Sequence, residues 1–461
     1  METFRDWLYR EYNYTDRTIS NTLSRLRRAD KILKIHNDEV YQFELEQEPE
    51  FKCLSSSVKS QIKRAVYLFN EYKSGLDPKQ RMKVLSLYAN IGVAEAFLQE
   101  IGFDVVVANE LDKRRADLYN QIYPSTKMIC GDINNIEIFN EIISESKKNL
   151  IDIVFATPPC QGMSTAGPLR KHDERNYLFL PVLKILKEIQ PKYAIIENVP
   201  LFITTIVRHN GKDMTIPEVI QSEVGEIYDI RIYTIDTKDY AIPQSRERAI
   251  LLLTRKNSGL KTWTLPEKSK QIITMRDVIG DLPKLDPYIS DIDEDSLYKI
   301  FPKFNERKER ALKISKWHNP PSHISRQVEA MMYTPTGETA FNNKYHYPRK
   351  ENGERVKGFL NTYKRQNWDT PAYTVTMDNR KISSQNNVHP GRFEGIDSDG
   401  NTIYSDARVL TLYEIMKIMT LPDDWPLPDN ISEAFVRRVI GEGIPPLFIK
   451  KLFNILREED E

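Results

Sequence analysis

The sequence has few cysteines, no long apolar run and no excess of charge of either sign. Only Cys53, Cys130 and Cys160 occur in 461 residues, which excludes a disulfide-stapled fold and leaves no paired spacing for a zinc site. No run of about 18 apolar residues offers a transmembrane helix. The N-terminus has mixed charge and lacks the apolar core of a secretory signal. We therefore expect a soluble cytoplasmic protein with no membrane partner and no bound metal.

The net charge is zero because 66 Lys and Arg balance 66 Asp and Glu. Taken alone, this balance argues against nucleic-acid binding. The charge is segregated, however, because residues 281–300 are acidic whereas residues 301–390 carry 16 Lys and Arg against 8 Asp and Glu. Tyr, Trp and Asn are interleaved with these cations. A basic, aromatic and amide-rich region without helical period fits a nucleic-acid-reading insert. It fits a solvated, irregular subdomain equally well.

Residues 1–78 are expected to form a separate helical domain. A capped amphipathic helix is predicted near Asp16 and Thr18, and a second one over 58–72, with the acidic stretch 44–50 between them. The cluster Arg25–Arg28 fits either a solvated helix face or a contact to DNA.

From residue 79 onward, short apolar runs alternate with helical patterns. This alternation predicts an α/β fold, a Rossmann-like and mostly parallel sheet with helices on both faces. In such a sheet, ligands bind at the carboxyl ends of the strands. The predicted strands lie near 84–88, 105–108, 151–155 and 193–196, and the predicted helices near 94–99, 113–123 and 178–189.

Two segments that follow predicted strands carry reactive side chains. Cys160 stands directly after Pro158-Pro159 at the end of an apolar strand, on a stiff turn that leads into a small, polar loop. A nucleophilic thiol needs a fixed backbone and local access, although most lone cysteines are inert. Glu197, in Glu197-Asn198-Val199, ends another apolar strand and can serve as an acid or as an ordinary salt-bridged carboxylate.

Together these segments resemble the C5-cytosine DNA methyltransferases. Pro159-Cys160-Gln161 is similar to the nucleophile motif of that family, and Glu197-Asn198-Val199 to its second catalytic motif. Three later segments follow in the family's order, namely Gln244-Ser245-Arg246-Glu247-Arg248, Arg408-Val409-Leu410-Thr411 through Leu421-Pro422-Asp423, and Gly441-Glu442-Gly443-Ile444-Pro445-Pro446. The likeness covers about residues 82–455, and the region 285–400 is expected to be variable.

The resemblance implies methyl transfer from S-adenosylmethionine to C5 of a cytosine flipped out of duplex DNA. The Cys160 thiolate would add to C6 while Glu197 holds the ring, and Arg246 and Arg248 would position the base. The other residues implied at the catalytic centre are Gln161 and Asn198.

The same likeness implies the cofactor residues. Glu110 would hold the ribose hydroxyls, and Leu111 stands where an aromatic often meets the adenine. Asn90 replaces a glycine and Glu442 replaces an asparagine of the family pattern, but asparagine tolerates a left-handed turn. No Gly-x-Gly-x-x-Gly turn follows the first strand, which disfavours a nicotinamide dehydrogenase. The implied set is Tyr88, Ala89, Asn90, Ile91, Gly92, Glu110, Leu111, Asp132, Ile133, Pro159, Glu442 and Gly443.

The implied DNA contacts are less specific. The loop 162–175 is expected to close over the flipped base. Candidate DNA-binding residues are Ser164, Lys171, Arg175, Gln244, Arg365, Arg380 and Lys381. The resulting division is 1–78 helical, 79–256 catalytic, 257–405 target recognition, and 406–461 completing the catalytic domain.

We therefore expect a sequence-specific, monomeric DNA (cytosine-5)-methyltransferase of a bacterial restriction–modification system. A cognate endonuclease would be its genetic partner rather than a physical one. The alternatives are the same chemistry on tRNA and a catalytically silent DNA-binding protein. The long variable region favours DNA over tRNA, and the intact Cys160, Glu197 and Arg246 argue against a silent protein.

Overall fold

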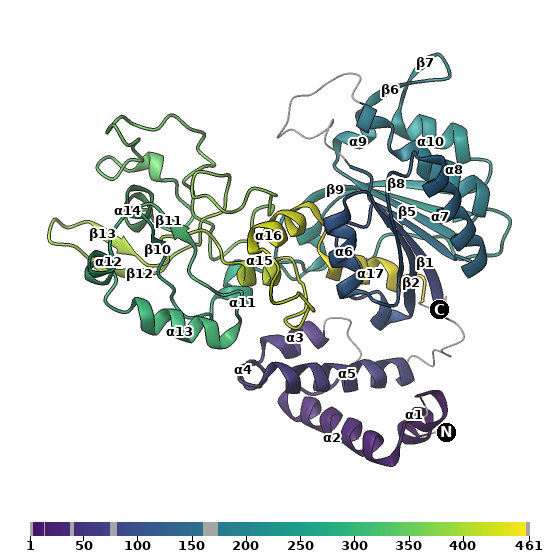
Figure 1. Ribbon diagram of the computed structural model, residues 1–461, viewed down its shortest axis with the longest axis horizontal. Coiled ribbons are helices and arrows are strands. Elements are labelled where there is room, and N and C mark those ends of the chain that lie inside the picture. Colours follow the sequence, from purple (N-terminus) through teal and green to yellow (C-terminus); the bar gives the residue numbers. More distant parts are fainter. Residues whose placement is uncertain (1–2, 13, 37–40, 74–80, 160–173, 458–461) are drawn as a thin grey trace.

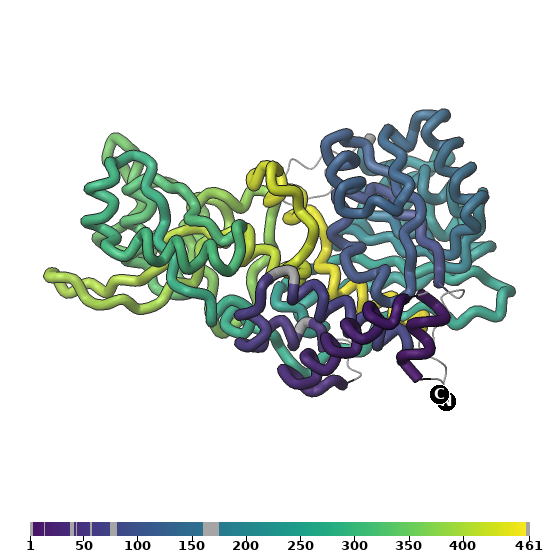
Figure 2. Tube along the Cα trace, turned by 60° about the horizontal axis from the view of Figure 1, so that its bottom comes forward, coloured from purple at the N-terminus to yellow at the C-terminus, as the bar shows by residue number. Residues whose placement is uncertain are grey.

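The computed structural model describes residues 3–12, 14–36, 41–73, 81–159 and 174–457. An α/β unit and a second, irregular lobe, which lies between β9 (Glu247–Arg255) and α15 in the chain, are joined by the C-terminal helices α15 (Leu412–Ile418) and α16 (Glu433–Glu442) (Figure 1). A bundle of N-terminal helices (purple) runs along the α/β unit and the yellow C-terminal segment (Figure 2). No helix of the described residues is long and apolar enough to cross a membrane.

The α/β unit contains a seven-stranded sheet in the order β3-β2-β1-β4-β5-β9-β8. The five strands from β3 to β5 are parallel, whereas β9 is antiparallel to both β5 and β8. This arrangement confirms the predicted Rossmann-like, mostly parallel sheet. The strands are β1 (Met82–Leu87), β2 (Phe103–Glu110), β3 (Lys127–Cys130), β4 (Ile153–Ala156), β5 (Tyr193–Asn198), β8 (Tyr228–Asp236) and β9 (Glu247–Arg255).

Both faces of the sheet are covered because successive side chains of a strand point to opposite sides. Leu85 and Leu87 pack in one apolar cluster, while Val84 packs in another on the opposite face. The first cluster includes residues of α7 (Ile136–Asn149), α8 (Phe179–Ile189), α9 (Leu201–Thr204) and α10 (Ile216–Val224), and the second is covered by α17 (Pro446–Asn454). The helix α6 (Lys113–Ile122) follows β2, and the hairpin β6 (Ile206–His209)–β7 (Lys212–Thr215) follows α9.

The C-terminal segment returns to the sheet. Phe453 of α17 meets the rings of Phe103, Phe155 and Trp263 edge-on, at centroid distances of 5.1–5.9 Å. These contacts join residues from opposite ends of the chain in one core. The preceding helices are α15 (Leu412–Ile418) and α16 (Glu433–Glu442).

The second lobe contains more helix than its sequence indicates. Two helices lie in the region that was expected to lack helical period, so that expectation was wrong. In α13 (Phe304–Ile314), only Phe304 and Ala311 are buried, and six of the eleven residues are charged. Such a narrow apolar stripe is too weak to be read from sequence. The other elements are α11 (Met275–Ile279), α12 (Glu294–Ile300), α14 (Ser325–Met332), η5 (Ala340–Asn342), β10 (Tyr288–Ile289), β11 (Ser322–His323), β12 (Phe393–Ile396) and β13 (Thr402–Tyr404).

The N-terminal unit is helical, as predicted, but two of its details differ. The side chain of Thr15, not of Asp16 or Thr18, caps the long helix by accepting from the Thr18 N–H. The acidic stretch 44–50 lies between α2 and α5, as expected, but it is itself mostly helical, because it spans the end of α3 and the start of α4. The helices are α1 (Phe4–Tyr12), α2 (Asp16–Ile32), α3 (Tyr41–Gln47), α4 (Pro49–Lys52) and α5 (Ser56–Lys73).

The α-helix expected over 94–99 is absent. The segment makes hydrogen bonds between residues three apart, such as Glu95 N–H to Gly92 O and Leu98 N–H to Glu95 O. It ends in the 3-10 turn η2 (Gln99–Ile101). The side chain of Glu95 is buried and bonded to Ser86 of β1, which holds this tighter turn against the sheet.

Candidate active site

The three strand ends that carry the predicted motifs are neighbours in the sheet. Strand β1 pairs with β4, with Leu87 opposite Ala156, and β4 pairs with β5, with Ala156 opposite Ile196. Thr157 then links the turns that follow β1 and β4. Its N–H donates to Leu87 O at 3.2 Å and its hydroxyl donates to Tyr88 O at 3.1 Å. The structure thus brings the described start of the predicted nucleophile motif and the predicted cofactor turn to one edge of the sheet.

Glu197 lies at the end of β5 and is 9 % exposed. Its carboxylate pairs with Arg248, whose Nε lies 2.7 Å from Oε1, and both side chains are nearly buried. Because β5 and β9 run antiparallel, Glu197 faces Ile250 and lies diagonally opposite Arg248. This ion pair orients the carboxylate and satisfies one of its oxygens, which offsets the cost of burying the charge.

Asn198 holds the turn that precedes the predicted nucleophile. Its Nδ2 donates to Pro158 O at 3.0 Å, and its Oδ1 accepts from Val199 N–H at 2.8 Å. The backbone two residues before position 160 is therefore fixed beside Glu197. Cys160, Gln161, Ser164 and Lys171 lie outside the described residues, as does nearly all of the loop 162–175. Pro159 and the exposed Arg175 are described.

Arg246 and Gln244 are turned into the protein, which differs from the prediction. Arg246 is 2 % exposed and donates to the carbonyls of Val375 and Gly441 at 2.8 and 3.0 Å. Gln244 is fully buried and accepts from Val375 N–H at 3.1 Å. These side chains bind the second lobe and α16 to β9. The expected DNA contact by Gln244 is therefore corrected to a role in positioning the second lobe. The expected role of Arg246 in positioning the base stays a prediction.

Arg365 is also unavailable to DNA, so this prediction was wrong. It is fully buried, and its guanidinium donates to four carbonyls within the second lobe, those of Met331, His389, Ser405 and Asp406, at 2.8–3.0 Å. The arginine guanidinium is planar and carries five N–H groups, so it can bind several loop carbonyls at once. Arg380 and Lys381, by contrast, are exposed.

The turn after β1 has an unusual backbone. Tyr88, Asn90 and Gly92 have φ angles of 59°, 52° and 78°, and Asn90 thus adopts the left-handed conformation that was expected for it. A Cβ at Gly92 would lie 2.1 Å from the ring of Tyr123. The turn therefore requires glycine at position 92, both for its φ and for space.

Glu110, at the end of β2, closes this turn. Its two oxygens accept from the N–H groups of Asn90 and Asp112, each at 2.9 Å. Burial raises the pKa of the Glu110 carboxyl, while these two donors act in the opposite direction. Leu111, the next residue, is 65 % exposed.

The neighbouring strand β3 brings Asp132 and Ile133 to the same edge, since Glu110 pairs with Cys130. Asp132 is exposed and Ile133 is buried. The predicted ribose and adenine residues are thus adjacent in space. Beside them, the buried Oδ1 of Asn90 has no hydrogen-bond partner among the described residues. An orphaned acceptor, a carboxylate and an exposed apolar side chain fit a ligand that carries an amino group, hydroxyls and a flat ring.

The end of α16 closes over the same turn. Asn90 Nδ2 donates to Val439 O at 3.1 Å, and Arg115 of α6 makes a bidentate pair with Glu442 at 2.7 and 3.1 Å. Gly443 packs against Val93, because a Cβ there would lie 2.9 Å from Val93 Cγ1. Glu442, which departs from the family pattern, thus anchors two helices.

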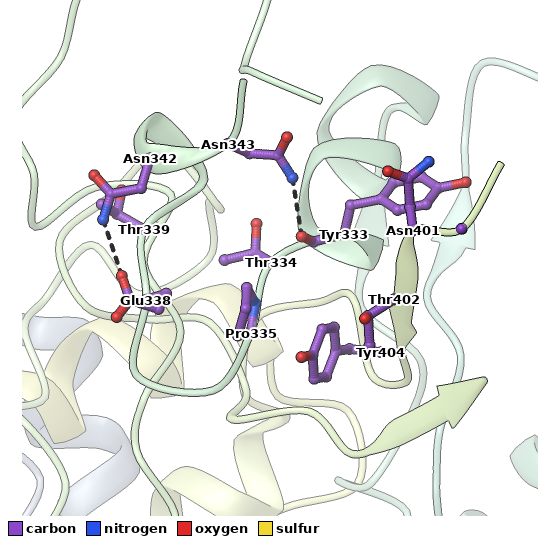
Figure 3. Close-up of a pocket in the computed structure, with 11 residues that line it drawn as sticks. Tyr333, Thr334, Pro335, Glu338, Thr339, Asn342, Asn343, Asn401, Thr402 and Tyr404 are labelled. Atoms are coloured by element: carbon purple, nitrogen blue, oxygen red, sulfur yellow. Dashed lines mark hydrogen bonds between the residues drawn. The ribbon is translucent and has the colours of Figure 1, made fainter. Parts of the chain in front are cut away.

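A pocket lies in the second lobe, between the end of α14, the segment 338–343 and the hairpin β12–β13 (Figure 3). Its amide groups are already engaged within the lobe. Asn342 Nδ2 donates to Glu338, and Asn343 Nδ2 donates to Tyr333 O, at 2.9 and 3.1 Å. None of the predicted site residues lines this pocket.

Two positioning residues escaped the sequence analysis. Thr157 stands directly before Pro158-Pro159, so its position beside the predicted nucleophile motif could have indicated its role. Arg115 gave no signal, because it lies in a charged stretch of α6 and its partner Glu442 is 327 residues away.

Comparison with known proteins identifies the family. The family model for C-5 cytosine-specific DNA methylases matches residues 82–458. The chain is 42% identical over 385 residues to the type II methyltransferase M1.HgaI of Avibacterium volantium, a match that covers 82% of this chain and 98% of the relative. It is 26% identical to M.NgoPII of Neisseria gonorrhoeae over 79% of this chain and 92% of that protein.

Solved structures support the fold alone. The crystal structure of a proposed DNA modification methyltransferase from an Escherichia coli prophage superimposes with a TM-score of 0.53 at 20% identity, over 82% of this chain and all of that one. The Entamoeba histolytica methyltransferase EhMeth gives a TM-score of 0.50 at 15% identity, over 82% of this chain and 98% of that one. The family match covers most of the chain and includes every motif described above. The chain belongs to the C-5 cytosine-specific DNA methylase family.

Proposed function

We propose that this protein transfers a methyl group from S-adenosylmethionine to C5 of cytosines within a specific sequence of duplex DNA. The observation that carries the proposal is the meeting of three strand ends, which brings the Glu197–Arg248 pair and the Asn198–Pro158 contact beside the turn 88–92. Membership of the C-5 cytosine-specific DNA methylase family supports the same reaction.

In the proposed mechanism the target cytosine leaves the base stack, because its ring carbons are inaccessible inside the duplex. The thiolate of Cys160 forms a bond to C6 as the C5–C6 double bond opens. Glu197, held by Arg248, donates a hydrogen bond to N3 and so stabilises the electron pair that is displaced into the ring. S-adenosylmethionine, when bound, supplies the methyl group that C5 takes. Loss of the C5 proton and expulsion of the Cys160 thiolate restore the ring double bond.

We assign the cofactor to the turn 88–92 and the ends of β2 and β3. Glu110 would accept from the ribose hydroxyls with the lone pairs that its backbone donors leave unused. Leu111 and Ile133 would flank the adenine, with Asp132 at its edge. Ala89, Ile91, Pro159 and Gly443 would contribute backbone and packing surface.

The lobe 257–405 is our candidate target-recognition domain. Its basic residues 301–390 supply the charge that DNA requires, and Arg380 and Lys381 remain the candidate contacts from the predicted set. The flanking segments 79–256 and 406–461 would form the catalytic domain, and 1–78 an accessory domain. Since relatives are type II methyltransferases, we assign the enzyme to a restriction–modification system in the bacterial cytoplasm, as a monomer whose cognate endonuclease is a genetic partner.

The test is transfer of labelled methyl groups to mixed-sequence duplex DNA and, in parallel, to tRNA. DNA should be labelled and tRNA should not. Cys160→Ala should abolish transfer and leave DNA binding largely intact, whereas Cys53→Ala, at an exposed cysteine of the helical unit, should behave as wild type. Labelling of tRNA alone would assign the chemistry to RNA, and labelling of neither substrate would refute an enzymatic role.

A further inference from the structure

Two large apolar side chains stand next to each other on the surface of the second lobe. Phe359 is 79 % exposed and Leu360 is 68 % exposed. Single exposed apolar residues are ordinary, but an adjacent pair at the tip of one turn forms a compact apolar point.

The turn that carries this pair is rigidly built. The N–H and the hydroxyl of Thr362 both donate to Phe359 O, at 2.9 and 2.8 Å. On one side, Gly358 lies so close to Phe341 that a Cβ would be 2.7 Å from the ring. On the other side, Asn361 O accepts from Asn386 N–H at 2.8 Å. The turn is therefore anchored at both ends while its two apolar side chains remain outside.

The surroundings of the pair are basic. Segment 344–364 contains six Lys and Arg against two Asp and Glu. Lys357 lies two residues before Phe359, and the adjoining loop, which reaches the turn through Asn386, presents the exposed Arg380 and Lys381. Two exposed apolar side chains surrounded by Lys and Arg are complementary to duplex DNA, in which phosphates surround the stacked apolar faces of the bases.

The segment that precedes the adjoining loop is bonded to the catalytic domain. Thr374 donates to Ser245 O at 2.7 Å, and Arg246 donates to Val375 O at 2.8 Å. A few residues later the chain forms the loop 378–387, which Asp378 closes by bonding Ser384 and Asn387. DNA bound along this loop and the turn that it supports would therefore lie next to a segment that is fixed to the catalytic domain.

We propose that Phe359 and Leu360 form a wedge that contacts base faces of the bound duplex and partly unstacks one base step. The proposal rests on the proposed function, because it takes DNA as the substrate. Apolar side chains that enter a base step contribute stacking contacts without neutralising phosphates. Their contribution should therefore be independent of salt.

The experiment uses the full-length enzyme and a DNA fragment whose methylated sites have been mapped with the wild type. The double variant Phe359→Ala, Leu360→Ala is compared with wild type and with Phe393→Ala, a matched control. Phe393 is 62 % exposed in the same lobe but lies on the hairpin β12–β13. Affinity is measured over a range of salt, and 2-aminopurine placed at successive positions beside the target reports unstacking.

We expect the double variant to bind DNA about 10- to 100-fold more weakly, with an unchanged slope of log K against log[salt]. Wild type and Phe393→Ala should raise the 2-aminopurine fluorescence at one step, and the double variant should not. Because both side chains are exposed, its melting temperature should match that of the wild type. A second variant, Phe359→Trp with Leu360→Met, should restore binding and fluorescence.

Wild-type affinity and fluorescence in the double variant would overturn the wedge. So would a shallower salt slope, which would indicate lost phosphate contacts. If the wild type self-associates in sedimentation, and the double variant binds DNA normally but stays monomeric, the surface is a protein interface and the wedge is overturned. Failure of the wild type to methylate any DNA would refute the proposed function itself, which keeps the two outcomes separate.

Discussion

Lys63 of the N-terminal helical unit forms an ion pair with Asp424, which lies 361 residues further along the chain. Lys63 also lies 2.7 Å from Glu46, and its side chain is 7 % exposed. The neighbouring Trp425 donates from Nε1 to Tyr123, whose hydroxyl donates to Gly92 O at 2.6 Å. The helical unit is thus connected, through two consecutive residues, to the turn that we assign to the cofactor.

Replacing Lys63 should destabilise the protein strongly. Lys63→Met leaves the carboxylates of Glu46 and Asp424 without their shared partner, and breaking a buried ion pair in this way costs about 3–5 kcal/mol. Urea unfolding at pH 7 measures the change. Lys31→Met, at an exposed position of α2, is the control and should have little effect. Equal losses in the two variants would show that the pair contributes nothing beyond a surface charge.

Glu95 should make the stability depend on pH. Burial raises its pKa to about 7, from an ordinary value of 4.5, although Ser86 and Tyr119 donate to it. The folded state therefore binds a proton more tightly than the unfolded state, so the free energy of unfolding should fall as pH rises from about 4.5 to about 7. A pKa shift of this size corresponds to a change of about 3 kcal/mol in the free energy of unfolding.

The substitution Glu95→Gln removes this titration. The stability of the variant relative to wild type should therefore rise between pH 5 and pH 8, as measured by urea unfolding at both values. A constant difference between the two proteins across this range would contradict the assignment.

The sequence was sufficient to predict the α/β sheet and the positions of most motifs at the ends of its strands. Strands such as β1, β4 and β5 are buried on both faces, so their continuous apolar runs are visible in sequence. The order of motifs then predicted which strand ends meet. The left-handed turn at Asn90 was also predictable, because the residue type limits the backbone.

The burial of polar side chains could not be predicted from the sequence. Glutamine and arginine often contact DNA, so the sequence favoured that role for Gln244, Arg246 and Arg365. Each of these side chains instead binds backbone groups in the interior of the protein. Whether an arginine faces a phosphate or a carbonyl is decided by loops brought together from distant positions. The same holds for α13, in which two buried residues do not produce a readable period.

Glu110→Gln should weaken S-adenosylmethionine binding. The substitution keeps the shape of the side chain but removes its charge, and a hydrogen bond to a charged group is worth about 1.5–3 kcal/mol, so the dissociation constant should rise about 10- to 100-fold. Calorimetric titration of the cofactor measures it. The exposed Glu141→Gln on α7 provides the control. Wild-type affinity in Glu110→Gln would remove this residue from the cofactor site.

Arg248→Met should reduce kcat while leaving DNA affinity close to that of the wild type. The variant deprives Glu197 of its 2.7 Å partner, so the carboxylate loses the orientation that the proposed ring contact needs. Because acid–base groups contribute about 10²–10⁴-fold, we expect kcat to fall about 100-fold. Single-turnover methylation at saturating DNA tests this. Arg231→Met on β8, where the side chain is 45 % exposed, should match wild type. A change confined to KM would instead assign Arg248 to DNA binding.

Gly92→Ala and Gly211→Ala separate backbone strain from crowding. The two glycines have nearly equal φ angles, 78° and 79°, but a Cβ at Gly211 meets no atom within 4 Å whereas one at Gly92 would overlap Tyr123. Gly211→Ala should therefore cost only the left-handed penalty of about 1–2 kcal/mol. Gly92→Ala should cost about 2–5 kcal/mol, because overpacking adds to it. It should also weaken cofactor binding, since Tyr123 must move away from the turn. Equal unfolding free energies for the two variants would show that the Tyr123 ring moves aside without cost and that its contact does not stabilise the turn.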